Sequence, residues 1–242
     1  MFRIAFRRIS AMIAAISCLA FMNAAKADVV IDTFSETPAV NYQVSLLNSS
    51  PYSAPSTLLG NGLTRDITVT VLAPVPANFN SVGGSIGGGA FSFNTDNVTQ
   101  AVVNLNYSGF TAATRDFSGG NSINLNFKDL NPGNVVGGGV ATDMPISISI
   151  GTTTGTLTGS LNAAGGSLIS VAIPFSGLSG TGDLSNVTSL SFTMNDSRLA
   201  TDFELTSVTV PTSAVPAPPG LALLLAAAPV VVLRRWKAKK TA

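Results

Sequence analysis

Between Asp28 and Val210 the chain alternates apolar residues with small polar residues, at a period of two. The clearest runs are AVVNLNY (101–107), SINLNF (122–127), ISISI (146–150), SLSFTM (189–194) and FELTSVTV (203–210). Such alternation is typical of β-strands that bury one face and expose the other. Less regular runs that also favour strands are VVIDTF, YQVSLL, DITVTVL, AFSF and SLISVAIPF.

Glycine-rich segments separate these runs and indicate turns. They read SVGGSIGGGA, NPGNVVGGG, NAAGG and SGLSGTGD. About ten short strands joined by such turns, without a helical period between them, predict an all-β fold. We therefore expect residues 28–210 to form an antiparallel β-sandwich of jelly-roll type.

The outward positions of the predicted strands carry hydrogen-bonding side chains without charge. Examples are Asn104, Asn106, Asn124, Asn126, Ser147 and Ser149. Two interpretations of these faces stay open. They are either the ordinary solvated surfaces of an exported β-protein or surfaces that meet neutral polar partners such as sugars.

The first 27 residues have the three parts of a secretory signal peptide. Arg3, Arg7 and Arg8 form its basic start, residues 9–22 its apolar core, and Ala25-Lys26-Ala27 its small-x-small cleavage site. An N-terminal membrane helix is the alternative, but the apolar core is short, so we expect cleavage after Ala27. Lipidation at Cys18 is disfavoured because Ala15 stands where a bulky aliphatic residue is expected. The mature chain would then contain no cysteine, and the whole chain contains no histidine.

Charge is unevenly distributed along the chain. All 12 acidic residues lie between Asp28 and Ala214, together with four basic residues, Arg65, Arg115, Lys128 and Arg198. This middle region therefore has a net charge of −8, whereas the other basic residues lie at the two ends. An acidic surface repels polyanions, so we expect no nucleic-acid partner.

Side chains for common catalytic chemistry are missing from the middle region. Residues 83–87 match the G-x-S-x-G pattern of a nucleophile elbow, but no histidine is available as the base that such a serine requires. The acidic residues are scattered singly and do not form the spaced pair of a glycoside hydrolase. Trp236 lies in the tail, so the domain lacks the tryptophan that often stacks on sugar rings. We expect no catalytic activity and no required cofactor.

Calcium is the one metal that the acidic residues suggest. Asp32 lies near the first predicted strand and Asp202 opens the last, so the two carboxylates could meet if the terminal strands pair. Asp96, in the FNTDN segment, is a further oxygen ligand candidate. The alternative is that all three are solvated residues at strand ends, because no calcium-loop spacing is present.

The chain ends with a proline cluster, a short apolar segment and a basic tail. The apolar segment, residues 221–233, has 13 residues and contains Pro229. As a helix it would be about 20 Å long, whereas a bilayer core requires about 30 Å. Trp236 suits a membrane interface, and the five basic residues after Leu233 would hold the tail on the cytoplasmic side. The segment predicts a short transmembrane helix that acts as a transient stop.

This ending resembles the PEP-CTERM sorting signal of Gram-negative bacteria. The motif residues are Val215, Pro216, Ala217, Pro218, Pro219 and Gly220, and Arg234 and Arg235 form the basic stop. Members of that family commonly carry glutamate where this chain has Ala217. The resemblance implies recognition by an exosortase, a membrane-embedded cysteine protease-transpeptidase that cuts near the motif. It further implies an inner-membrane-anchored precursor and a final location at the cell surface or in the exopolysaccharide matrix.

Three functional hypotheses follow, over a chain divided into residues 1–27, 28–210 and 211–242. The first is a structural or adhesive protein without catalysis, sorted by exosortase and associated with exopolysaccharide. The alternative is a carbohydrate-binding module, with or without calcium, that uses the Asn, Ser and Thr faces or the loop ends. The third, a carboxylate-based hydrolase, requires two acids within about 10 Å on either side of a cleft.

Overall fold

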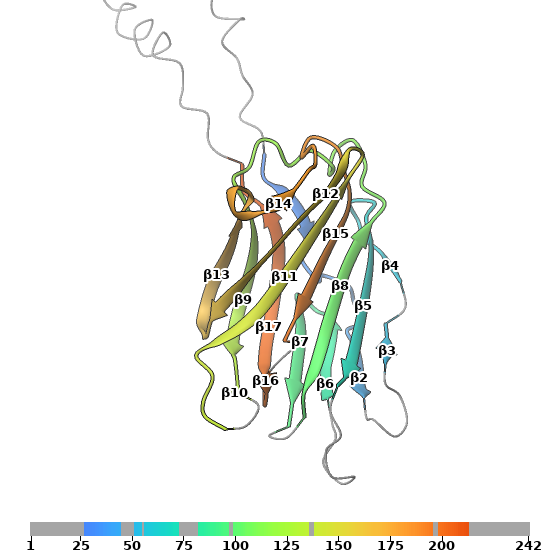
Figure 1. Ribbon diagram of the computed structural model, residues 1–242. Helices are drawn as coiled ribbons and strands as arrows, with labels where there is room; N and C mark the ends of the chain where they lie inside the picture. Colours follow the sequence, from blue (N-terminus) through green and yellow to red (C-terminus); the bar gives the residue numbers. More distant parts are fainter. Residues whose placement is uncertain are drawn as a thin grey trace, which may run out of the picture. The chain divides into compact units, whose positions relative to one another are not determined.

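Two antiparallel β-sheets pack face to face in the computed structural model (Figure 1). The structure describes residues 27–44, 51–54, 56–72, 82–96, 99–135, 138–195 and 198–212. They belong to one unit, Ala27–Thr212. The predicted antiparallel β-sandwich is confirmed.

Sheet A contains seven of the described strands and sheet B contains eight. Sheet A consists of β1 (Val29–Asp32), β2 (Val40–Val44), β6 (Val82–Gly87), β7 (Ala90–Thr95), β9 (Ser122–Asn131), β13 (Gly166–Pro174) and β17 (Asp202–Val210). Sheet B consists of β3 (Tyr52–Ser53), β4 (Thr57–Leu58), β5 (Thr64–Val71), β8 (Ala101–Ser108), β11 (Asp143–Thr152), β12 (Gly155–Ala164), β14 (Ser179–Gly180) and β15 (Val187–Met194). A small separate pair joins β10 (Asn134–Val135) to β16 (Arg198–Leu199).

The order of strands within each sheet differs from their order in the sequence. Sheet A runs β13-β9-β17-β7-β6-β2, with β1 paired to β17, and sheet B runs β14-β12-β11-β15-β8-β5-β3, with β4 paired to β5. The chain therefore passes repeatedly from one sheet to the other. At one such crossing only Gly165 separates β12 from β13.

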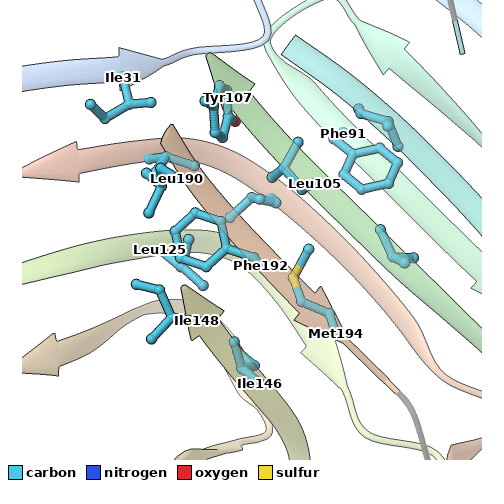
Figure 2. Close-up of a cluster of buried hydrophobic side chains, with 14 of the residues drawn as sticks. Ile31, Phe91, Leu105, Tyr107, Leu125, Ile146, Ile148, Leu190, Phe192 and Met194 are labelled. Carbon is cyan, nitrogen blue, oxygen red and sulfur yellow. The ribbon is translucent and has the colours of Figure 1, made fainter. Parts of the chain in front are cut away.

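The core lies between the sheets and is built from the inward residue of each alternating pair. Ile146, Ile148 and Ile150 of β11 are buried there, and Leu190, Phe192 and Met194 of β15 lie beside them (Figure 2). Sheet A contributes an aromatic group in which the ring of Phe203 contacts those of Phe91, Phe93 and Phe127. Burial of these large side chains supplies the main driving force for folding, because residues 27–212 contain no cysteine and therefore no disulfide.

Two segments that the sequence favoured as turns are largely strand in the structure. Within SVGGSIGGGA, residues 82–87 form β6, and NAAGG contains the end of β12 and the start of β13. Glycine is required in β6 because a Cβ atom at Gly84 would lie 2.0 Å from the carbonyl oxygen of Ser92 and 2.7 Å from the hydroxyl of Tyr42. The turn interpretation was therefore wrong for residues 82–87, but Gly88 and Gly89, with φ of 68° and 98°, do form the turn between β6 and β7.

Helical structure in the described part of the chain is limited to one short 3-10 turn, Phe175–Gly177. None of the described helical residues forms a segment long and apolar enough to cross a bilayer. The predicted signal peptide, residues 1–27, reaches only Ala27 of the described chain, and the predicted terminal helix lies outside it.

Candidate functional site

The outer surface of sheet B carries a continuous patch of small polar side chains, which we call the polar face. Its two rows cross β12, β11, β15, β8 and β5 in that order. The first row is Ser160, Ser147, Thr193, Asn104 and Thr68, and the second is Thr158, Ser149, Ser191, Asn106 and Asp66. Each residue is directly opposite its neighbours in the β-ladder, so the rows follow from strand register.

The polar face exists because each of its strands alternates over the residues that form the two rows. On β8, Val103 and Leu105 are fully buried while Asn104 and Asn106 are half-buried on the outer surface. Neighbouring strands lie about 4.8 Å apart, so each row presents a hydrogen-bonding group at that interval. Successive outward residues on one strand lie about 7 Å apart, which sets the spacing between the two rows.

Hydroxyl and amide groups make up almost the whole polar face. Each can donate and accept hydrogen bonds, and one cross-strand bond is formed within the face, from Thr193 Oγ1 to Asn104 Oδ1 at 2.9 Å. The one carboxylate in the two rows, Asp66, accepts a hydrogen bond from Ser56. Chemically, the face can bind an uncharged partner that is rich in hydroxyl groups.

Sheet A has an outer face of different character, and two of the predicted polar residues lie there. Asn124 and Asn126 belong to β9, on the opposite side of the molecule from the polar face. The same strand carries Lys128, which forms an ion pair with Glu204 at 2.9 Å. The structure thus separates the six predicted asparagine and serine positions into four on sheet B and two on a partly charged sheet A.

A second notable group is a buried ionic cluster formed by Asp32, Glu36, Arg65 and Tyr107. Arg65 Nη1 lies 2.8 Å from Asp32 Oδ2 and 2.9 Å from Glu36 Oε1. The hydroxyl of Tyr107 donates to Asp32 Oδ2 at 2.9 Å, and the backbone N–H of Phe34 donates to Asp32 Oδ1 at 2.8 Å. The Asp32 and Arg65 side chains are each only 2% exposed.

The titration behaviour of this cluster follows from burial and its charges. Burial alone would lower the pKa of Arg65, but Asp32 and Glu36 outweigh it and leave that pKa above its ordinary value. Burial, with the Asp32 carboxylate adding to it, raises the pKa of Tyr107 well above its ordinary value. Arg65 therefore stays charged and Tyr107 stays a hydrogen-bond donor across the physiological pH range.

Two cavities flank Glu36 at this end of the sandwich. One, of 270 Å³, is lined by residues 30–33, 35–36 and 58–61, and the other, of 230 Å³, has mainly apolar walls that include Val40, Ile67 and Ile86. Glu36 Oε2 is buried without a hydrogen-bond partner among the described residues. Asp32 and Glu36 both line the larger cavity, so two acids do approach each other beside a hollow.

This acid pair fits a structural role better than hydrolysis. A glycoside hydrolase needs one carboxyl group to transfer a proton and a second to act on the sugar or on water. Asp32 accepts hydrogen bonds from Arg65, Tyr107 and Phe34 and its side chain is only 2% exposed, so these contacts hold it as part of the buried core. The Ser85 of the G-x-S-x-G match lies inside β6, where its hydroxyl is 3.0 Å from that of Ser92.

The two calcium candidates are not brought together. The terminal strands β1 and β17 do pair, but Asp32 lies opposite Val208, whereas Asp202 begins β17 opposite Asn94 and Asn131. Asp96 accepts a hydrogen bond from Thr99. Among the residues that the structure describes, no three acidic, histidine or cysteine side chains form a group that could hold a metal ion.

The predicted sorting and cleavage residues lie at or beyond the ends of the described chain. Ala27 is its first residue, and Ala25, residues 215–220, Arg234 and Arg235 lie outside it. Their roles therefore stay predictions from the sequence.

Comparison with known proteins identifies no family. No protein-family model matches the chain, and no curated protein is similar to it. Among solved structures, a family 11 carbohydrate-binding module in solution is 15% identical with a TM-score of 0.42, covering 80% of this chain and 100% of its own. The Clostridium thermocellum family 11 module in complex with a β-1,3-1,4-mixed-linked tetrasaccharide is 15% identical with a TM-score of 0.38, covering 79% and 100%. An arabinose-bound α-L-arabinofuranosidase is 11% identical with a TM-score of 0.37, covering 78% of this chain and 27% of its own. These scores are low, so the likeness assigns neither a family nor a function.

Proposed function

We propose that this protein is an exported, non-catalytic protein of the cell surface or exopolysaccharide matrix, whose jelly-roll-like sandwich binds neutral polysaccharide through the polar face of sheet B. The signal peptide would be removed after Ala27. An exosortase would then process the inner-membrane precursor near residues 215–220, with Arg234 and Arg235 holding the tail until it does. The terminal segments of the sequence support the export route, and the polar face supports the binding role.

The observation that carries the binding role is the extent and neutrality of the polar face. Two rows of hydroxyl and amide groups cross five neighbouring strands, and only Asp66 among them is charged. An extended polysaccharide repeats its hydroxyl groups at regular intervals, as the rows do. The net charge of −8 between Asp28 and Ala214 would repel acidic polymers, so an uncharged chain is the better partner.

Binding, rather than hydrolysis, is the activity that the side chains of this face support. General acid–base cleavage of a sugar needs two carboxyl groups on either side of the bond. The two rows offer one carboxylate, Asp66, and it is held by Ser56. A surface of this composition can hold a chain by many weak hydrogen bonds without cutting it.

Affinity electrophoresis tests this function. The purified protein is run in gels that contain a soluble uncharged glucan and, for comparison, in gels that contain an acidic polyuronate. We expect retardation by the uncharged polymer only, and no change on adding calcium or a chelator. The double variant Asn106→Ala with Ser149→Ala removes two groups from one row. Each hydrogen bond contributes about 0.5–1.5 kcal/mol, so binding should weaken at least about fivefold.

A matched control is available on the other sheet. Asn124→Ala removes the same kind of side chain from the outer surface of β9 and should leave binding unchanged. Equal loss in this control would contradict the assignment to sheet B. Failure to bind any uncharged polysaccharide, including that of the producing cell, would overturn the binding role itself.

Export and sorting have an independent test. Mass spectrometry of the protein recovered from the cell surface should find Asp28 as its first residue and no peptide beyond about Pro219. Recovery of peptides that contain Trp236 would contradict processing near the proline motif, whatever the outcome of the binding experiment.

A further inference from the structure

One margin of the sandwich is formed by β12 and β13, and we call it the uncharged margin. In sheet A, β13 is the outermost strand, and β9 is its one partner among the described strands (Figure 1). In sheet B, β12 is bordered by β14 only at Leu157 and Thr158. The outer backbone groups of β13 are therefore directed away from sheet A.

Charge is absent from a long part of the sequence around this margin. No Asp, Glu, Lys or Arg occurs from Met144 to Gly182, which includes all of β12, β13 and β14. Proteins usually protect long edge strands with charged side chains, proline or a bulge, because an unprotected edge pairs with other strands. Here Leu168, with a φ of 53°, distorts the ladder at one point, but Ile169–Pro174 pair regularly with β9.

Half-covered apolar side chains follow the same margin. Leu157 and Leu161 of β12 and Ile169 and Val171 of β13 pack against the core while remaining partly exposed. Leu168 is 84% exposed. An additional strand beside β13 would satisfy its backbone groups and cover part of this apolar surface at the same time.

We propose that β13 pairs antiparallel with β13 of a second copy of this chain, so that two copies of sheet A become one continuous sheet. A two-fold axis relates the two copies and passes between their Ser170 residues, so that the two Gly166–Pro174 strands lie alongside each other over their full length. It places Ile169 opposite Val171 on the core side and Leu168 opposite Ala172 on the outer side. In the central pairs apolar residues thus meet apolar residues and serine meets serine, while towards the ends Ser167 lies opposite Ile173 and Gly166 opposite Pro174; no like charges oppose each other at any position.

This self-complementarity favours a second copy over an unrelated partner. In a domain with net charge −8, contact between two copies at most positions would bring like charges together. The uncharged margin avoids that repulsion, and the antiparallel arrangement matches every other pairing in both sheets.

Single-cysteine crosslinking tests the proposed register. The experiment uses the full chain in mild detergent with Cys18→Ser, which leaves it without cysteine. Opposite residues of antiparallel strands have Cα atoms about 4.5–5.5 Å apart, within the range of a disulfide. Ser170→Cys should therefore form disulfide-linked dimers on mild oxidation. Ser147→Cys, which is exposed on the outer surface of β11, is the matched control and should stay monomeric.

A mixing experiment separates this register from other contacts. Leu168→Cys and Ala172→Cys should crosslink with each other but not each with itself, because only the mixed pair lies face to face. Equal crosslinking of Ser170→Cys and Ser147→Cys would overturn the proposal, as would self-crosslinking of Leu168→Cys at the rate of the mixed pair.

A charge variant tests the association without a crosslink. Ser170→Lys places two positive charges opposite each other at the two-fold axis, and sedimentation should show self-association weakened at least about tenfold. Ser147→Lys should leave it unchanged. Because Ser170 is an exposed residue, the thermal unfolding curve of Ser170→Lys should match that of the parent at protein concentrations low enough for both to be monomeric. Self-association that Ser170→Lys leaves intact would contradict pairing through β13.

Discussion

Replacement of Asp32 by asparagine should be among the most destabilising changes of similar size in this domain. Asparagine keeps the shape of the side chain but removes its charge, and it turns one of the two accepting oxygens into a donor. Asp32 accepts from Arg65, Tyr107 and the backbone of Phe34 at 2.8 to 2.9 Å, all within the buried interior. At least one of these donors then loses its acceptor.

The magnitude follows from the burial of the pair. Removing one partner of a buried ion pair typically costs about 3–5 kcal/mol. Glu36, whose side chain is 29% exposed, still contacts Arg65 at 2.9 Å, so the loss should lie near the lower limit, about 3 kcal/mol. For a domain of this size that corresponds to a fall in Tm of about 6–12 °C.

Urea unfolding followed by circular dichroism measures this loss as a shift in midpoint at unchanged slope. Glu204→Gln is the matched control, because it breaks the Lys128–Glu204 ion pair, in which Lys128 is 61% exposed. Exposed pairs contribute about 0.2–1 kcal/mol. If Asp32→Asn costs no more than Glu204→Gln, the buried cluster does not stabilise the fold as argued.

Three further outcomes are expected. Because burial raises the pKa of Tyr107, the folded state should lose stability as the pH rises above the ordinary tyrosine pKa of about 10. In a plot of urea midpoint against pH, Tyr107→Phe should flatten this decline. Burial also raises the pKa of Asp202. The contribution of Asp202 to folding stability should therefore be greatest below the ordinary aspartate pKa and decline as the pH rises through the raised pKa of the folded state. Asp202→Asn should remove that decline and gain less than about 1 kcal/mol at neutral pH, because the group is partly exposed. Gly84→Ala should cost about 1–3 kcal/mol by forcing β6 from β7, whereas Gly60→Ala, with nothing within 4 Å of the added Cβ, should leave the urea midpoint within about 0.5 kcal/mol.

The period of two in the sequence predicted which side chains point inward, and it also contained a signal for the ionic cluster. Arg65 shares the inward register of β5 with Ile67, Val69 and Val71. A buried arginine requires carboxylate partners, so its position on the apolar side implied them. Which acids these are could not be predicted, because Asp32 and Glu36 reach Arg65 from another part of the chain.

Strand neighbours were beyond sequence reasoning for a similar reason. The alternating runs at 101–107, 122–127 and 146–150 look alike, but β8 and β11 belong to sheet B and β9 belongs to sheet A. That choice depends on long-range pairing and on how each inward face packs. The outward residues were identified from the pattern, but the single polar face that unites Asn104, Asn106, Ser147 and Ser149 emerged only from the topology.

The proposed dimer also bears on how a face of small polar residues could hold a polysaccharide. Two copies related by a two-fold axis through Ser170 and perpendicular to the sheets would direct both polar faces to the same side. One long chain could then contact both faces, and the second contact would be intramolecular, with a high effective concentration. The weak hydrogen bonds of the two faces would together hold the chain, although the two rows contain no aromatic side chain to stack on a sugar ring. In this arrangement the absence of charge at the margin and the single charge, Asp66, on the polar face serve the same role, because both surfaces must meet partners across an otherwise acidic domain.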